Sequence, residues 1–266
     1  MSSRSILFHY FQDQGSKEIV HKEVQRKVKC SDFVDDFAFI PPLFEERGWK
    51  SPITPSIPPF EDMVKEFYAN IEPIDLQSFR TSVRKKEFEV NRDLICSIIG
   101  VPLVNELTYP YLPDTFPDKE AMMMVFVDGT SPSWLSHQAK VKIIDFSEPM
   151  RTLSQIVSAN IWLVGHYTDF GVDRAAFLFA LTTGVPIDFS THAIQLMLTA
   201  YEVDNSCLPF GCLITQILRH LGVEPLECEP FVRQKESFNK HTMHLLASQK
   251  KKKFHPGASS VGASSR

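Results

Sequence analysis

A series of apolar segments between residues 148 and 222 most constrains what this chain can fold into. In this region apolar residues recur with a period near that of a helix, which is typical of helices that bury one face. The pattern predicts helices over about 148–164, from 172, from 188 and over about 209–221. Because the loops between them are short, we expect antiparallel neighbours in a compact helical unit over 147–222.

Start and stop signals divide this unit into separate helices. Gly184 and Pro186 close the second helix, Asp188 is a good cap for the third, and Gly222 follows the fourth. The expected core of the unit consists of Leu153, Ile156, Trp162, Phe177, Leu181, Ile194, Leu198, Leu213 and Ile217.

The earlier half of the chain carries weaker signals. An apolar stripe from Phe60 to Ile71 predicts an amphipathic helix. Alternation over 79–90 predicts a short β element with a charged face, and Asn91 is placed to cap a helix that ends at Gly100. The apolar run 122–127 fits either a helix or a strand.

These signals predict a mainly α protein (α-rich α+β). We expect a multi-helix domain with a small β element and a disordered basic C-terminal tail. The expected boundaries are a polar lead over 1–32, the folded domain over 33–229 and the tail over 230–266.

Charge is distributed unevenly along the chain. The net charge is -4, yet the segment from Pro230 onward carries +7, which leaves -11 on residues 1–229. Within the tail, Lys250, Lys251, Lys252 and Lys253 form an unbroken cationic run. Such a run binds nucleic-acid phosphates without reading sequence. A nuclear import signal and a merely solvated tail remain open alternatives.

Membrane insertion and secretion are not expected. The longest charge-free apolar stretches, 175–187 and 189–201, hold thirteen residues each, whereas a spanning helix needs about 20 apolar residues. The N-terminus lacks the apolar run of a signal peptide. We therefore expect an intracellular protein, nuclear or cytoplasmic, whose sparse cysteines are buried or free thiols.

Two short motifs resemble catalytic motifs, but their position or residue order does not fit the corresponding enzymes. Phe33-Val34-Asp35-Asp36 resembles a polymerase turn, but too few residues precede it for a polymerase palm, so we interpret both acids as solvated. Asp128-Gly129-Thr130 reverses the order of an aspartic protease motif and predicts a tight turn.

Cys207, Cys212, His220 and Cys228 contain the elements of a zinc site, but their spacing is wide. Cys212 and His220 also fall in one predicted helix, about 12 Å apart along its axis. We therefore expect no metal ligands, no cofactor and no catalytic residues in this chain.

An ordered set of motifs resembles the plant transposon protein domain, which occurs in retrotransposon-derived reading frames of plants. Its most specific pieces are the helix Val64-Lys65-Glu66-Phe67-Tyr68-Ala69-Asn70 and the turn from Leu181 to Asp188, in which Val185 replaces a common lysine. The other matching segments are 47–49, 83–90, 94–102, 173–180 and 208–215.

The resemblance covers about residues 38–225 and implies descent from a transposable element. It implies no catalytic residue. We interpret Arg47, Trp49, Tyr68 and Asn70 as structural anchors rather than site residues.

Three functions are compatible with this sequence. The first is a non-catalytic, Gag-like protein that self-associates or binds nucleic acid weakly through its tail. The second is a host-adopted module that binds other proteins through an exposed apolar surface. The third is a metal-dependent nuclease or integrase, which requires carboxylates that converge in the fold.

Overall fold

The computed structural model describes residues 25–105, 108–128, 140–163, 169–203, 207–233, 235–239 and 242. This part of the chain is mainly helical with two small sheets, as predicted. The α-helices are α2 (Ile40–Glu45), α3 (Lys50–Ile53), α4 (Glu61–Ala69), α5 (Arg92–Ile99), α6 (Lys119–Phe126), α7 (Glu148–Asn160), α8 (Val172–Thr182), α9 (Phe189–Glu202) and α10 (Gly211–His220). Short 3-10 helices are η1 (Cys30–Asp32), η2 (Asp35–Phe37) and η3 (Ile143–Asp145). The strands are β1 (Glu72–Pro73), β2 (Ser78–Val83), β3 (Lys86–Asn91), β4 (Lys140–Lys142) and β5 (Asp169–Gly171).

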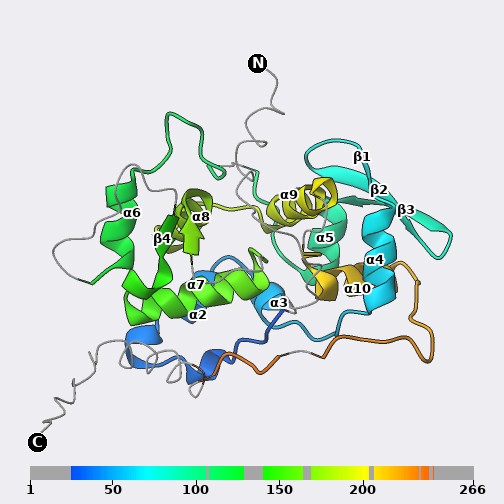
Figure 1. The fold of residues 1–266 in the computed structure, drawn as a ribbon, viewed down its shortest axis with the longest axis horizontal. Helices are drawn as coiled ribbons and strands as arrows, with labels where there is room; N and C mark the ends of the chain where they lie inside the picture. The colour runs from blue at the N-terminus through cyan, green and yellow to red at the C-terminus, as the bar shows by residue number, and fades with distance from the viewer. Residues whose placement is uncertain are drawn as a thin grey trace, which may run out of the picture.

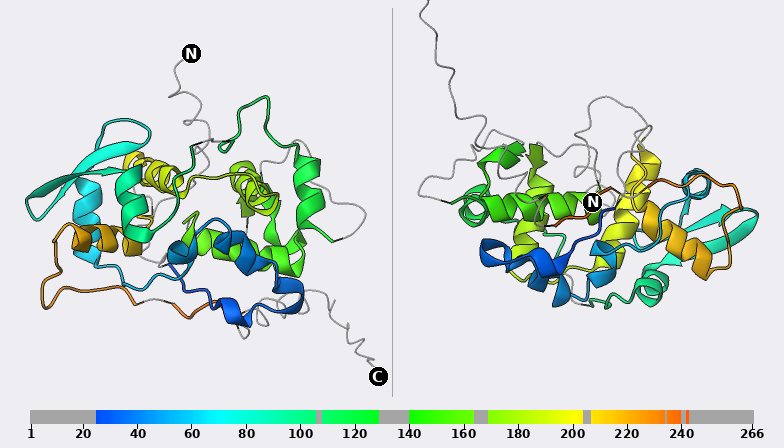
Figure 2. Two further views of the ribbon diagram at one scale, coloured as in Figure 1. Left: turned by 180° about the vertical axis from the view of Figure 1, so that it is seen from behind. Right: turned by 90° about the horizontal axis from the view of Figure 1, so that it is seen from below.

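The elements gather at two ends of an elongated molecule (Figure 1). One end holds the antiparallel sheet β1-β2-β3 with α4, α5, α9 and α10. The other holds α6, α7, α8 and the antiparallel pair β4-β5, and the views from behind and below show the same division (Figure 2). The short helices α2 and α3 lie beside α7 between these two groups.

The predicted caps form as the sequence indicates. The Asn91 side chain accepts a hydrogen bond from the Leu94 amide at 3.0 Å, which satisfies a free donor at the start of α5. Gly100 ends that helix with φ of 72°, a conformation that glycine adopts at low cost. At the start of α9, the Asp188 carboxylate accepts from the Thr191 amide at 3.1 Å.

Residues 122–126 of the ambiguous run 122–127 lie in α6 and Val127 follows its end, so the run is helical rather than a strand. Asp118 caps α6 by accepting from the amides of Glu120 and Ala121. Met122, Met123 and Phe126 are buried, and they share one side of the helix because Phe126 lies about one turn after both methionines. Unbranched methionine side chains also favour helix over strand.

The predicted antiparallel bundle over 147–222 is wrong, although its helices exist. The closest backbone neighbours of α7 are α3 and η3, and those of α8 are α6 and β5. Helix α9 packs on α4, α5 and β3, while α10 packs on α4 and α5. The later helices therefore insert among earlier elements. All nine predicted core residues are nevertheless buried, because helical periodicity identifies the buried face of a helix. Periodicity does not identify which element covers that face, so the packing partners were not predicted.

The two flanks of the described chain contact each other. After α10, residues 223–233 and 235–239 run back along the body as an extended segment, which we call the strap, drawn in yellow to orange along the lower edge of Figure 1. The Val232 amide donates to the Pro59 carbonyl at 3.0 Å, and the Phe238 amide donates to the Lys27 carbonyl at 2.8 Å. Packing contacts therefore extend past both predicted boundaries, at residues 33 and 229.

Phe238 is the main apolar anchor of the strap. Its side chain is 1% exposed, and the Arg26 guanidinium lies over its ring at 4.0 Å. Phe231, seven residues earlier, is 53% exposed.

We predict that Phe238→Ala lowers the free energy of unfolding by about 3 kcal/mol, because the substitution leaves a cavity in a packed site. The matched variant Phe231→Ala should cost less than about 1 kcal/mol, since its ring is half in solvent. Urea denaturation followed by circular dichroism measures both. Equal effects of the two substitutions would contradict the anchoring role of Phe238.

Candidate functional site

The structural anchors expected from the motifs connect separate segments of the fold: Trp49 and Tyr68 are buried, Arg47 is partly buried and Asn70 is exposed. The Arg47 guanidinium donates to the carbonyls of Leu43 and Val185, at 3.1 Å each, and to that of Ala180 at 3.4 Å. It thereby joins α2 to the end of α8 and the turn that follows. Burial lowers the pKa of Arg47.

Trp49, Tyr68 and Asn70 join further segments. Trp49 is 1% exposed and stacks with Phe177 of α8 at a ring separation of 6.4 Å. The Tyr68 hydroxyl donates to the Pro209 carbonyl at 2.8 Å, and burial raises the pKa of this phenol well above its usual value. The Asn70 amide donates to the Ser82 carbonyl at 2.9 Å. These motif residues fix the relative positions of helices and the sheet.

A buried ion pair links α5 to α9. The Arg92 guanidinium pairs with the Asp188 carboxylate, whose side chain is 1% exposed. Arg92 also donates to the Val104 carbonyl at 2.9 Å. Asp188 therefore both caps α9 and neutralises a partly buried cation, and only the cap was expected from the sequence.

His192 lies within a cluster of aromatic rings. Its ring centroid is 4.7 Å from that of Phe177 and 5.0 Å from that of Trp162. Burial lowers the pKa of His192 to about 3, and a hydrogen bond with the Ile161 backbone only partly opposes this effect. Its Nε2 atom has no hydrogen-bond partner among the described residues. His192 is therefore a neutral core residue at physiological pH.

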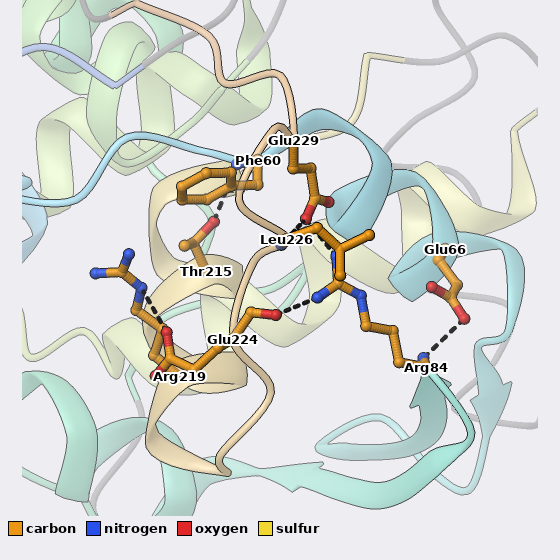
Figure 3. A network of polar contacts seen from close by, with 8 residues as sticks. All are labelled: Phe60, Glu66, Arg84, Thr215, Arg219, Glu224, Leu226 and Glu229. Atoms are coloured by element: carbon orange, nitrogen blue, oxygen red, sulfur yellow. Dashed lines mark hydrogen bonds and ion pairs between the residues drawn. The ribbon is translucent and has the colours of Figure 1, made fainter.

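A polar network joins the β2-β3 hairpin to the strap (Figure 3). Arg84, at the hairpin turn, donates to the Glu224 carbonyl and pairs with the Glu229 carboxylate. The Arg84 amide donates to the Glu66 carboxylate of α4 at 2.8 Å. Lys86 donates to the Leu221 carbonyl just after α10. The hairpin therefore holds the start of the strap against the body.

The strap also folds on itself beside this network. The Leu226 amide donates to the Glu229 carboxylate at 2.9 Å, and the Glu229 amide donates to the Leu226 carbonyl at 3.1 Å. The Arg219 guanidinium lies 3.6 Å from the Glu224 carboxylate. In the close view, Glu229 and Glu224 approach the Arg84 side chain from the strap (Figure 3).

The other candidate residues from the sequence analysis do not come together in a site within the described residues. Lys250, Lys251, Lys252 and Lys253 lie outside the described residues. Asp35 and Asp36 are exposed in η2 beside buried Phe33, in agreement with solvated acids.

No group of three or more histidine, cysteine or acidic side chains is placed to hold a metal within the described ranges. Of the cysteines in the wide zinc-like pattern, Cys212 is buried, Cys207 is partly buried and Cys228 is exposed. Among the helices that the structure describes, none combines the length and apolar character needed to span a membrane.

Sequence reasoning missed the contact between Arg84 and Glu229. A short β element with a charged face was expected over 79–90, but neither its turn at Arg84 and Lys85 nor its partner 145 residues later was predicted. No local pattern connects two residues at that separation, whereas the run Arg84-Lys85-Lys86 was a visible cationic signal.

We predict that Asp188→Ala lowers the free energy of unfolding by about 3 kcal/mol, because it removes a helix cap and leaves Arg92 without its partner. Asp188→Asn should cost less, since its amide oxygen still caps α9. Asp118→Ala, which removes an exposed cap, should cost about 1 kcal/mol. Chemical denaturation of the three variants tests this order, and an Asp188→Ala effect no larger than that of Asp118→Ala would contradict it.

We predict that His192 makes the protein sensitive to acid. Its pKa is about 3 in the fold and about 6.5 in the unfolded chain, so the unfolded state binds the extra proton. The contribution of neutral His192 is complete above pH 6.5 and is lost as pH falls toward 3. At pH 5 the loss relative to pH 7.5 should be about 2 kcal/mol.

His192→Phe should remove this loss while it keeps an aromatic ring in the cluster. Asp173 acts in the opposite direction, because burial raises its pKa to about 6 and favours the folded state in acid. Both proteins retain Asp173, so the difference between their denaturation curves at pH 5 and 7.5 isolates His192. Identical pH dependence would refute the prediction.

Comparison with known protein families identifies the family of this chain. The model of the family described as "Putative plant retrotransposon-related domain" matches residues 45–224, more than half of the chain. The comparisons with curated proteins and with solved structures give no match. The matched range contains Arg47, Trp49, Tyr68 and Asn70 and ends where the strap begins, in agreement with the resemblance seen in the sequence. The chain therefore belongs to the plant retrotransposon-related domain family.

Proposed function

We propose that this chain is a non-catalytic, Gag-like protein of retrotransposon origin that binds nucleic acid through its basic tail. The observation that carries the proposal is the separation of charge, with -11 on residues 1–229 and +7 on residues 230–266. Phosphate contacts are electrostatic and do not require a shaped pocket. The acidic body repels nucleic acid, so Lys250 to Lys253 provide the main contact.

The use of the motif residues supports a binding role over catalysis. Arg47, Tyr68 and Asn70 donate to backbone carbonyls, and Arg92 pairs with Asp188. Groups that perform chemistry need access to a substrate, whereas these groups connect helices within the fold. The family motifs thus stabilise the folded body, and the proposed binding is left to the tail.

The contacts of the strap fix the point on the body from which the basic tail begins. Phe238 bridges to Val28 on the body, so the segment that leads to Lys250 starts from a fixed point. Nucleic acid bound by the tail is then held close to the body, as a Gag-like packaging protein requires.

A protein-interaction module is the second candidate. It is favoured by two exposed apolar side chains on the strap, Leu226 at 68% and Phe231 at 53% exposure. Scattered apolar residues are common on protein surfaces, so this observation carries less weight than the charge separation.

We predict that replacement of Lys250, Lys251, Lys252 and Lys253 by glutamine weakens nucleic-acid binding at least about tenfold at low salt. Fluorescence anisotropy with an oligo(dT) of about 20 nucleotides measures the affinity between about 50 and 200 mM salt. The slope of log affinity against log salt should fall by about 0.7 for each lost phosphate contact.

The substitution is preferable to truncation at Glu229, which would remove the buried Phe238. Replacement of Lys27, Lys29, Lys140 and Lys142 by glutamine provides a control with the same change of charge on the body. Equal weakening by both quadruple variants would contradict a tail-centred contact. If the unaltered chain does not bind at low salt, the nucleic-acid proposal fails and the protein-interaction candidate gains.

A further inference from the structure

The tip of the β2-β3 hairpin is built from charged residues at positions that normally take glycine or asparagine. Val83 pairs with Lys86, so Arg84 and Lys85 form a two-residue turn. Both have positive φ, 54° and 64°. Two-residue turns with this backbone favour Asn-Gly because other side chains are strained there. The backbone of Arg84 and Lys85 is therefore strained, and the turn places two cations next to each other.

Arg84 is held in place for recognition of an anion. Its amide is fixed by the Glu66 carboxylate, and its guanidinium binds the Glu229 carboxylate and the Glu224 carbonyl. A guanidinium presents a planar fork of donors that matches carboxylate and phosphate groups alike. The strap thus places a carboxylate where a phosphate of a ligand can bind.

The strap reverses the local charge. The body contributes four cations here, Arg84, Lys85, Lys86 and Arg219, and two carboxylates, Glu66 and Glu87. The stretch 224–229 of the strap adds three carboxylates, those of Glu224, Glu227 and Glu229. The local net charge is therefore +2 without the strap and -1 with it, which means that the closed strap repels a polyanion.

The strap is weakly anchored at this point. Leu226, Glu227, Cys228 and Pro230 are exposed, so little apolar surface is buried between Val223 and Val232. The Glu229 side chain is 3% exposed, yet its Oε1 atom has no hydrogen-bond partner within the described part of the chain. Burial of a carboxylate with an unsatisfied oxygen opposes closure. Arg84 provides the ion pair that holds Glu229, and the far end of the stretch is held by the Glu61 amide, which donates to the Pro230 carbonyl at 3.3 Å.

We propose that the hairpin tip is a second nucleic-acid site, covered by the strap. Arg84, Lys85 and Lys86 bind backbone phosphates once the acidic stretch 224–229 is displaced, and Glu229 occupies the phosphate position in the closed state. This site lies on the body and is separate from the tail lysines. It deepens the proposed nucleic-acid function, and its test uses a chain whose tail is neutralised, so that the two proposals fail independently.

The experiment measures anisotropy of labelled oligo(dT) with the full-length chain in which Lys250 to Lys253 are glutamine. In this background Glu224→Gln/Glu229→Gln should tighten binding roughly three- to tenfold at low salt, because two competing carboxylates are removed. Adding Lys85→Gln should abolish the gain, since Lys85 is exposed at the tip.

A charge-matched control replaces Glu120 and Glu148 on α6 and α7 by glutamine, at the other end of the molecule (Figure 1). It changes the net charge equally and should leave affinity unchanged. Equal tightening by this control would overturn the proposal, because net charge alone would then explain the result. No tightening by the folded Glu224/Glu229 variant would overturn it as well.

A second measurement avoids substitutions that weaken the fold. Hydrogen exchange of the unaltered chain, with and without oligo(dT), reports on the Glu229 and Leu226 amides. Displacement of the strap predicts that these amides exchange at least about threefold faster when oligo(dT) is bound. Protection, or no change at saturating oligo(dT), would show that the strap stays closed and would overturn the proposal.

Discussion

The aromatic cluster around Phe177 is the contact on which the rest of the structure depends. Its ring lies within 6.4 Å of the rings of Trp49, Tyr109, Trp162 and His192. These residues come from five separate segments, so one buried contact fixes α8 and α9 relative to the loops before α3, α6 and β5. Large aromatic rings bury much apolar surface and prefer defined mutual orientations. The cluster thus explains how two groups of elements form one body.

Polar side chains also connect helices in the fold, in addition to the aromatic cluster. Arg47 binds the end of α8, and Arg92 with Asp188 joins α5 to α9. Each contact provides a partner for a backbone carbonyl or for a buried charged side chain. Without that partner the group would destabilise the folded state. Arg47, Arg92 and Asp188 therefore connect segments of the fold.

The strap extends the folded body beyond the family domain. It starts where the matched range ends, passes the hairpin tip and reaches the N-terminal flank at Val28. One chain thereby carries cations at the hairpin that are paired with its own acids, and cations in the tail that follow the strap. The Arg84 contact joins the hairpin turn to the strap through the Glu229 carboxylate and the Glu224 carbonyl.

Local signals in the sequence determined the helices, their caps and the buried residues, since each depends on neighbours within a few positions. The caps at Asn91, Gly100 and Asp188 were predicted correctly for this reason, as was a β element over 79–90, although its turn into two paired strands was not predicted. The order in which helices pack was not predictable, because an apolar face records burial but not its partner. The ion pair of Asp188 with Arg92, the neutral state of His192 and the contact of Arg84 with Glu229 were decided only by tertiary structure, because each joins residues that are distant in sequence.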